Sequence, residues 1–234
     1  MKDLSVNAAV SRVSYFGSGI IAGRSADGLN AVSAYFIMGR SPLSRNRKFT
    51  DSGTGLKIEA HIQTAIKNEE RLLYNPVIAD RGLTVMGNGS HTEQIYKALK
   101  SGQGLNDINK SLYPFDDEPY FTPRIFAVSA FAGEKMCLTM GITKNCSLGI
   151  THQVFDYPDI PAGTACFLHS FEGDEEPLPS FTGEPMCVLI GGSIFDIVAN
   201  VWENLNSFNK VALYVRNENI KTGQIISRII NKNR

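Results

Sequence analysis

The sequence predicts an α+β layered fold, because short strand-like runs recur along the chain while only two segments carry convincing helix signals. The strand-like runs are rich in β-branched and aromatic residues or alternate between apolar and polar residues. No internal repeat is visible, and helices do not alternate with strands as they would in a doubly wound parallel sheet. At 234 residues the chain can bury a sizeable core, and we expect a single domain over residues 1–234.

Several strands are expected in the first third of the chain. Residues 13–16 and 20–24 read as a hairpin joined by a flexible turn, Gly17-Ser18-Gly19. The run Ala31–Met38 is short and apolar, which is typical of a strand covered on both faces. Residues 55–63 alternate between apolar and polar side chains, as in a strand with one wet face.

Two further strands and the first helix follow. Residues 72–78 and 83–86 form strands divided by a turn at Asp80-Arg81-Gly82. Ser90 and Glu93 then have the spacing of a capping box, which predicts a helix that begins at this point. Residues 107–121 are polar and contain proline, so we expect a long loop there.

The second half of the chain returns to strands and adds one helix. Ser193 and Asp196 have the spacing of a helix cap, and an apolar face follows them. The segment after Gly223 fits either a strand or a helix. Further strands are expected at residues 124–131, 135–140, 149–154, 165–171 and 210–216.

Composition and charge exclude several classes of partner. Basic and acidic residues are equal in number, 23 of each, so no long-range field would draw the chain to nucleic acid or to an anionic membrane. The N-terminus lacks a signal-peptide pattern, and no run approaches the roughly 20 apolar residues that a spanning helix needs. We therefore expect a soluble, cytoplasmic protein with neither nucleic-acid nor membrane partners.

The cysteines and histidines predict no metal site. Cys137, Cys146, Cys166 and Cys187 are widely separated and form no Cys-x-x-Cys pair, so neither a disulfide framework nor a zinc site is indicated. We expect them to be small buried hydrophobic residues in a reducing cytosol. The histidines and acidic residues also lack metal-ligand spacing.

The stretch Gly39–Arg47 has the composition of an anion site. Arg40, Arg45 and Arg47 follow a buried strand directly, and guanidinium groups present paired donors that fit phosphate or carboxylate. Ser44 and Asn46 add neutral hydrogen-bonding groups. The alternative is a solvated loop whose arginines pair with nearby carboxylates.

A second cluster lies at the start of the predicted helix. Its glycine-containing turn leaves free backbone amides, which can bind a phosphate or a substrate carbonyl. Ordinary capping by Ser90 is the alternative, but it leaves two members of the cluster unexplained. The cluster consists of Asn88, Gly89, Ser90, His91 and Thr92.

Two smaller clusters complete the set of candidate residues. Tyr74 and Asn75 place a phenol and an amide at a strand end, although a tyrosine that only anchors a sheet edge has the same pattern. Thr122 and Arg124 flank Pro123, which restricts the residue before it to an extended shape. The acids Asp117 and Glu118 lie just upstream, and the pattern does not choose between them.

Taken together and in this order, the clusters resemble the stand-alone IMP cyclohydrolase family, the archaeal-type enzyme and its bacterial relatives. The resemblance covers most of the chain and includes the late segment Pro177–Pro185. It implies an Ntn-hydrolase-like, four-layer α-β-β-α sandwich with two antiparallel sheets. The absence of an exposed Ser, Thr or Cys nucleophile near Met1 agrees with members of this family that do not process themselves.

The resemblance also implies a reaction. The family closes the second purine ring by converting 5-formamidoimidazole-4-carboxamide ribotide to IMP with loss of water, and needs neither cofactor nor metal. It implies that Arg40 and Tyr74 face the reacting groups, and that Asp117 or Glu118 accepts the amide proton. The implied substrate-binding residues are Ser44, Arg45, Asn46, Arg47, Asn75, Asn88, Gly89, Ser90, His91, Thr92, Thr122 and Arg124.

Two other functions fit the same residues. One is a nucleotide-binding or regulatory protein that keeps the phosphate pocket without turnover, and the other is an amidohydrolase that acts on a related ribotide. A phenol at the reacting end favours an enzyme, because a binding module needs only the phosphate donors. The small-molecule partner expected in each case is a purine ribotide, and exposed sheet edges leave a homo-oligomer open.

Overall fold

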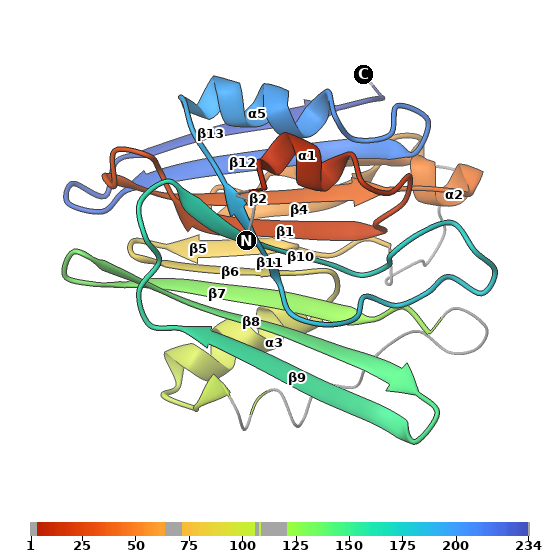
Figure 1. Ribbon diagram of the computed structural model, residues 1–234, viewed down its shortest axis with the longest axis horizontal. Helices are drawn as coiled ribbons and strands as arrows, with labels where there is room; N and C mark the ends of the chain where they lie inside the picture. Colours follow the sequence, from red (N-terminus) through yellow and green to blue (C-terminus); the bar gives the residue numbers. More distant parts are fainter. Residues whose placement is uncertain (1–3, 64–71, 106–107, 109–120, 234) are drawn as a thin grey trace.

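The computed structural model describes residues 4–63, 72–105, 108 and 121–233 (Figure 1). Within them the strands form two antiparallel sheets. The six-stranded sheet has the spatial order β11 (Met186–Leu189), β10 (Thr164–His169), β1 (Ser18–Arg24), β2 (Asn30–Met38), β12 (Lys210–Asn219) and β13 (Ile225–Asn231). The seven-stranded sheet follows chain order: β3 (Arg47–Asp51), β4 (Gly55–Ala60), β5 (Val77–Asp80), β6 (Leu83–Gly87), β7 (Arg124–Ala132), β8 (Lys135–Cys146) and β9 (Gly149–Tyr157).

Helices cover the outer faces of both sheets, which gives four layers (Figure 1). Helices α1 (Val6–Val10) and α5 (Ile194–Trp202) pack with the outer face of the six-stranded sheet in one apolar cluster. Helix α3 (His91–Lys100) packs on β6 and β7 of the other sheet. A third and central cluster fills the space between the sheets, so the predicted α+β sandwich is confirmed.

The N-terminal hairpin prediction was wrong. Residues 13–16 are not a strand, and the expected turn contains the first residues of β1, where Ser18 pairs with Ile37 and Gly19 with Phe36. A Cβ on Gly19 would lie 2.1 Å from the ring of Phe36, so glycine is needed for the close packing of two strands and not for a bend. The local sequence pattern alone predicts a turn at such a glycine.

Other boundaries differ for similar reasons. Residues 72–76 are irregular, and the strand begins only at Val77. Helix α1 and the strands β3 and β11 were not predicted. The segment after Gly223 is the edge strand β13. Both strands that flank the turn after Asp80 are confirmed.

The two predicted helix caps had different outcomes. Ser193 and Asp196 form a reciprocal capping box at the start of α5, as expected. Ser90 accepts no capping hydrogen bond from the helix, and the Thr92 hydroxyl instead donates to the Gly89 carbonyl at 2.8 Å. The spacing was right, but the backbone of Ser90 is already helical, which turns its side chain away from the amides.

The prediction of buried cysteines holds for Cys166 alone, since Cys146 and Cys187 are exposed and Cys137 is half-buried. Within the described ranges, no helix has the length and apolar character that crossing a membrane requires.

Candidate active site

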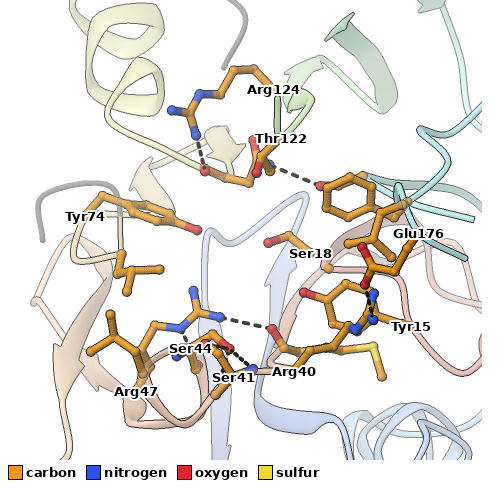
Figure 2. Close-up of a pocket in the computed structure, with 18 residues that line it drawn as sticks. Tyr15, Ser18, Arg40, Ser41, Ser44, Arg47, Tyr74, Thr122, Arg124 and Glu176 are labelled. Carbon is orange, nitrogen blue, oxygen red and sulfur yellow. Dashed lines mark hydrogen bonds and ion pairs between the residues drawn. The ribbon is translucent and has the colours of Figure 1, made fainter. Parts of the chain in front are cut away.

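A cavity of about 530 Å³ opens at one end of the sandwich, between the ends of several strands (Figure 2). This volume suits a ligand of nucleotide size. Figure 2 shows Tyr74 and Arg47 facing a common space, with Thr122 and Arg124 across from Arg47, and with Arg40 beside Tyr15 and Glu176. The described lining consists of Tyr15, Gly17, Ser18, Met38, Arg40, Ser41, Leu43, Ser44, Arg47, Leu72, Tyr74, Asn88, Thr122, Arg124, Ser170, Phe171, Glu176 and Leu178.

The connection between β2 and β3, with the first residue of β3, brings four charged or polar residues to this cavity. Helix α2 (Pro42–Arg45) is a single turn in which Ser41 and Ser44 cap each other reciprocally. Gly39 lets this turn approach the end of β2, because a Cβ there would lie 2.8 Å from the Ser44 carbonyl carbon. The tight connection leaves Arg40, Ser41, Ser44 and Arg47 in the cavity wall.

Arg47 is the most buried cation of the site, with 6% of its surface exposed. Its Nε donates to the Ser44 carbonyl at 2.7 Å, and its Nη2 donates to the Met38 carbonyl at 3.0 Å. Both partners are neutral. In the part of the chain that the structure describes, Arg47 forms no ion pair, so its positive charge is available to an anion in the cavity.

Arg40 is half-buried and forms an ion pair with Glu176 through its Nη2 atom. Its guanidinium carbon also lies 5.7 Å from the centre of the Tyr15 ring. Burial raises the pKa of the Tyr15 phenol, and the three nearby arginines counteract only part of that rise. Arg40 is thus held at the cavity rim by a neutral ring and one exposed carboxylate.

Arg45 and Asn46 are not in the cavity lining. The Arg45 Nε donates to the Gly39 carbonyl at 2.8 Å, and its guanidinium lies 4.0 Å from the centre of the Phe208 ring. Asn46 exchanges two hydrogen bonds with the backbone of Ile62. Both side chains therefore hold the α2 connection against its neighbours, a role that the sequence pattern did not separate from anion binding.

Tyr74 reaches the cavity from the irregular segment before β5, and only 9% of its surface is exposed. Its hydroxyl lies 3.0 Å from the hydroxyl of Tyr35 on β2. Tyr35 is fully buried and also forms a hydrogen bond with Ser18. Burial raises the pKa of the Tyr35 phenol well above its ordinary value, and the nearby Tyr74 makes the next largest contribution to this rise. Tyr35 therefore stays protonated and fixes the position of the Tyr74 hydroxyl.

Asn88 organises the opposite wall. Its side-chain amide donates to the Pro123 carbonyl at 2.8 Å and to the Ser170 hydroxyl at 3.1 Å, and its oxygen accepts from the Ile125 amide. Arg124 donates to the Asn88 carbonyl at 3.3 Å. Asn88 thus ties the start of β7 to the segment after β10, and this positions the cavity wall.

His91 and Thr92 lie behind this wall and not in the lining. Burial, with a smaller contribution from Arg124, lowers the pKa of His91 to about 4, so the imidazole is neutral at pH 7. Its Nε2 donates to the Ile125 carbonyl at 3.0 Å. Gly89 is also buried, and a Cβ there would lie 2.9 Å from Arg124 Nη1, so glycine lets the guanidinium lie close to the backbone.

Two of the predicted residues face a different cavity. Asn75 and Ser90 are exposed and line a second cavity of about 470 Å³, which shares Tyr74 with the first. Asp117 and Glu118, the two candidate bases, lie outside the described residues. Seven of the predicted residues meet in the first lining: Arg40, Ser44, Arg47, Tyr74, Asn88, Thr122 and Arg124.

Several lining residues were missed. Ser18 was assigned to a turn, and Ser170 and Phe171 were assigned to a strand without a role. Glu176 lies in the acidic loop after β10, and its contact with Arg40 joins positions that are far apart in the chain. No local signal predicts such a contact. Among the described residues, no three of His, Cys, Asp and Glu lie close enough together to hold a metal ion.

Comparison with known proteins assigns the chain to a family. The model of the family described as IMP cyclohydrolase-like protein matches residues 15–223. No curated protein matches the chain. The match spans most of the sequence and includes every described residue of the cavity lining. The chain belongs to the IMP cyclohydrolase-like family.

Proposed function

We propose that this protein is an IMP cyclohydrolase, which closes 5-formamidoimidazole-4-carboxamide ribotide to IMP. The carboxamide nitrogen attacks the formyl carbon of the same molecule, and the carbonyl oxygen becomes a hydroxyl on a tetrahedral carbon. That hydroxyl leaves as water and the ring double bond forms. The substrate supplies every atom of the product, so the protein has to fold the substrate, stabilise charge and move protons.

The cations of the cavity support binding of the ribotide phosphate. Arg47 is buried, its hydrogen bonds to described residues go to two carbonyl groups, and Ser44 also lies in the lining. A phosphate dianion completes such a site through charge-assisted hydrogen bonds. Thr122 and Arg124 lie across the cavity, where the far end of a nucleotide would reach.

The paired tyrosine hydroxyls support stabilisation of the formyl oxygen. As the amide nitrogen attacks, negative charge develops on this oxygen, and a positioned donor lowers the barrier because it needs no reorganisation. Tyr74 is such a donor, since Tyr35 fixes its hydroxyl at 3.0 Å. Arg40 at the rim adds positive charge to the same cavity.

A proton must also leave the attacking carboxamide nitrogen. In the proposed mechanism Asp117 or Glu118 accepts it, and a carboxylate in that role is typical of general base catalysis. One observation carries the proposal as a whole: a phenol held by a buried second phenol shares a cavity of nucleotide size with a buried arginine that forms no ion pair among the described residues, in a chain of this family.

The test is incubation of purified protein with the formylated carboxamide ribotide, with IMP and formate followed by chromatography. We expect IMP to form far above the rate without protein, and to form equally fast after treatment with a chelator. Tyr74→Phe keeps the ring but removes the hydroxyl, so it should lower kcat by about 10²–10³, the cost of losing one oxyanion donor, while substrate still binds.

Other outcomes select other functions. Binding of the ribotide without IMP above the spontaneous rate would indicate a nucleotide-binding protein. Release of formate in place of IMP would indicate an amidohydrolase, in which water and not the internal amide attacks. Unchanged turnover in Tyr74→Phe would remove the phenol from the mechanism even if IMP forms.

A further inference from the structure

Two cysteines stand directly opposite each other on neighbouring strands. Cys166 on β10 pairs with Cys187 on the edge strand β11 in an antiparallel ladder. Side chains of directly opposed residues lie on the same face of a sheet and close together. Both thiols are free in this structure.

Backbone hydrogen bonds show which kind of pair this is. The Ile190 amide donates to the Gly163 carbonyl at 2.9 Å, three rungs from the cysteines, while the Leu189 amide points away from β10 and donates to Leu4. Hydrogen-bonded and non-hydrogen-bonded pairs alternate along an antiparallel ladder. Counting from these two rungs, the cysteine pair is a non-hydrogen-bonded one.

Non-hydrogen-bonded pairs are the closer type, with Cα atoms about 4.5 Å apart. Disulfides span Cα separations of about 4.4–6.8 Å. The ladder therefore already holds Cys166 and Cys187 at a separation that a disulfide can bridge, with no change of register.

The two thiols differ in access. Cys187 is exposed at the sheet edge, whereas Cys166 is buried, with 5% of its surface exposed. Burial raises the pKa of Cys166 to about 11, although a hydrogen bond from Tyr157 opposes this shift. An oxidant from solvent therefore meets Cys187 first, and Cys166 lies within reach as the second sulfur.

We propose that Cys166 and Cys187 form a reversible cross-strand disulfide when the protein meets a peroxide. The Cys187 thiolate attacks the peroxide oxygen, the O–O bond breaks, and one oxygen leaves as water while the other stays on sulfur as a sulfenic acid. The Cys166 sulfur then attacks the Cys187 sulfur, the S–S bond forms, and the hydroxyl leaves with the Cys166 proton as a second water. The two sulfurs together lose two electrons, which reduce the peroxide.

The bond would close the connection between β10 and β11. This connection carries Ser170, Phe171, Glu176 and Leu178, all of which line the candidate active site. A covalent tie between its two ends restricts the unfolded chain, so the oxidised protein should unfold at a higher temperature. The proposal does not depend on which reaction the cavity catalyses.

The test uses the full chain, treated with hydrogen peroxide and then with an alkylating agent. Peptides are mapped by mass spectrometry without reduction. We expect a cross-linked peptide pair that contains Cys166 and Cys187 and is two hydrogens lighter than the separate peptides, and we expect a thiol reductant to release it. The thermal midpoint of the oxidised protein should rise in step with the cross-linked fraction.

Two variants serve as controls. Cys146→Ser removes another exposed thiol and should leave the cross-link intact. Cys187→Ser combined with Leu189→Cys keeps an exposed thiol on the same face of β11 but moves it opposite Thr164, so it should give no cross-link to Cys166. The proposal is overturned if wild-type Cys187 accumulates as a sulfinic acid, if it joins Cys146 or another chain, or if oxidation lowers the midpoint.

Discussion

Arg216 and Arg47 are both buried arginines, with 4% and 6% of their surfaces exposed, but their surroundings differ. Arg216 lies between the sheets, where its Nη1 contacts Glu218 at 2.7 Å and Thr84 at 3.4 Å. Arg47 contacts two carbonyls and borders an open cavity. A buried cation beside its own carboxylate is already neutralised, whereas one beside neutral groups and a cavity is prepared for an external anion.

The largest effect should come from breaking the neutralised pair. Glu218 also accepts a hydrogen bond from the Gly82 amide at 2.8 Å. Glu218→Ala leaves Arg216 as an uncompensated buried charge, so the free energy of unfolding should fall by about 3–5 kcal/mol. Chemical denaturation measures this, and kcat of the folded variant should match that of the wild type.

The exposed pair Glu134–Lys221 is the control for this variant. Glu134→Ala removes a solvent-exposed ion pair and should cost less than about 1 kcal/mol. If Glu134→Ala and Glu218→Ala lowered the free energy of unfolding equally, burial would not be the reason that the Arg216–Glu218 pair stabilises the fold.

Arg40→Ala should lower turnover with little effect on stability, which is the opposite of the result expected for Glu218→Ala. The Arg40–Glu176 pair is partly exposed, with 34% and 75% of the side-chain surfaces accessible, so stability should change by less than about 1 kcal/mol. Turnover of the ribotide should fall by about 10²–10³, because in the proposed mechanism Arg40 stabilises charge in the cavity. Steady-state kinetics beside a denaturation curve separate the two effects.

Arg228 provides the matched control, since its guanidinium also lies over an aromatic ring, 4.7 Å from the centre of Phe195, but away from the cavity. Arg228→Ala should leave kcat and KM unchanged. If Arg40→Ala instead lost stability and kept turnover, the distinction drawn between the two kinds of arginine would be wrong.

The pH dependence of stability tests whether the cavity wall depends on a neutral imidazole. Well above pH 6.5 His91 is uncharged in both the folded and the unfolded chain, so it adds no pH dependence. Between pH 6.5 and about 4 only the unfolded chain takes up the proton, because burial lowers the folded pKa to about 4, and the free energy of unfolding falls.

His91→Gln keeps a donor for the Ile125 carbonyl but cannot titrate. Over this pH range its loss of stability should be smaller than that of the wild type, by about 3 kcal/mol at most. The pKa of His169 is also lowered to about 4 by burial, so some loss should persist. Identical acid profiles for His91→Gln and wild type would contradict the buried neutral state.

The smallest effect concerns the second tyrosine. Tyr35→Phe keeps the packing and removes the hydroxyl that holds Tyr74, so kcat should fall about tenfold with KM unchanged, which corresponds to one hydrogen bond. In the double variant with Tyr74→Phe, the Tyr35 change should have no further effect on kcat, because its role acts through Tyr74.

Tyr214 is the neighbour of Tyr35 across the β2–β12 ladder and is equally part of the central core. It does not line the cavity. Tyr214→Phe should therefore leave kcat unchanged. A fall in kcat equal to that of Tyr35→Phe would point to a general effect of lost buried hydroxyls and not to positioning of Tyr74.

Most strands and both long helices could be predicted from the sequence, because their apolar periodicity is set by burial of one or both faces. The errors lie where a contact with another strand or the local backbone conformation determines the structure. Gly19 is a strand residue because Phe36 lies over it, and Ser90 fails to cap because its backbone is already helical. The Ntn-hydrolase-like character, self-association and the roles of Asp117 and Glu118 stay predictions.

The sequence by itself determined the layered class, the family and the clusters from which the site is drawn, since these depend on residue type and order. Arg45 and Arg47 are only two residues apart, and only the tertiary structure separated their roles. Arg47 faces the cavity, whereas Arg45 stacks on Phe208. The tertiary structure also brought Glu176 to Arg40 and Cys187 opposite Cys166. Such contacts depend on strand register and on how the sheets stack, and the local sequence does not specify either.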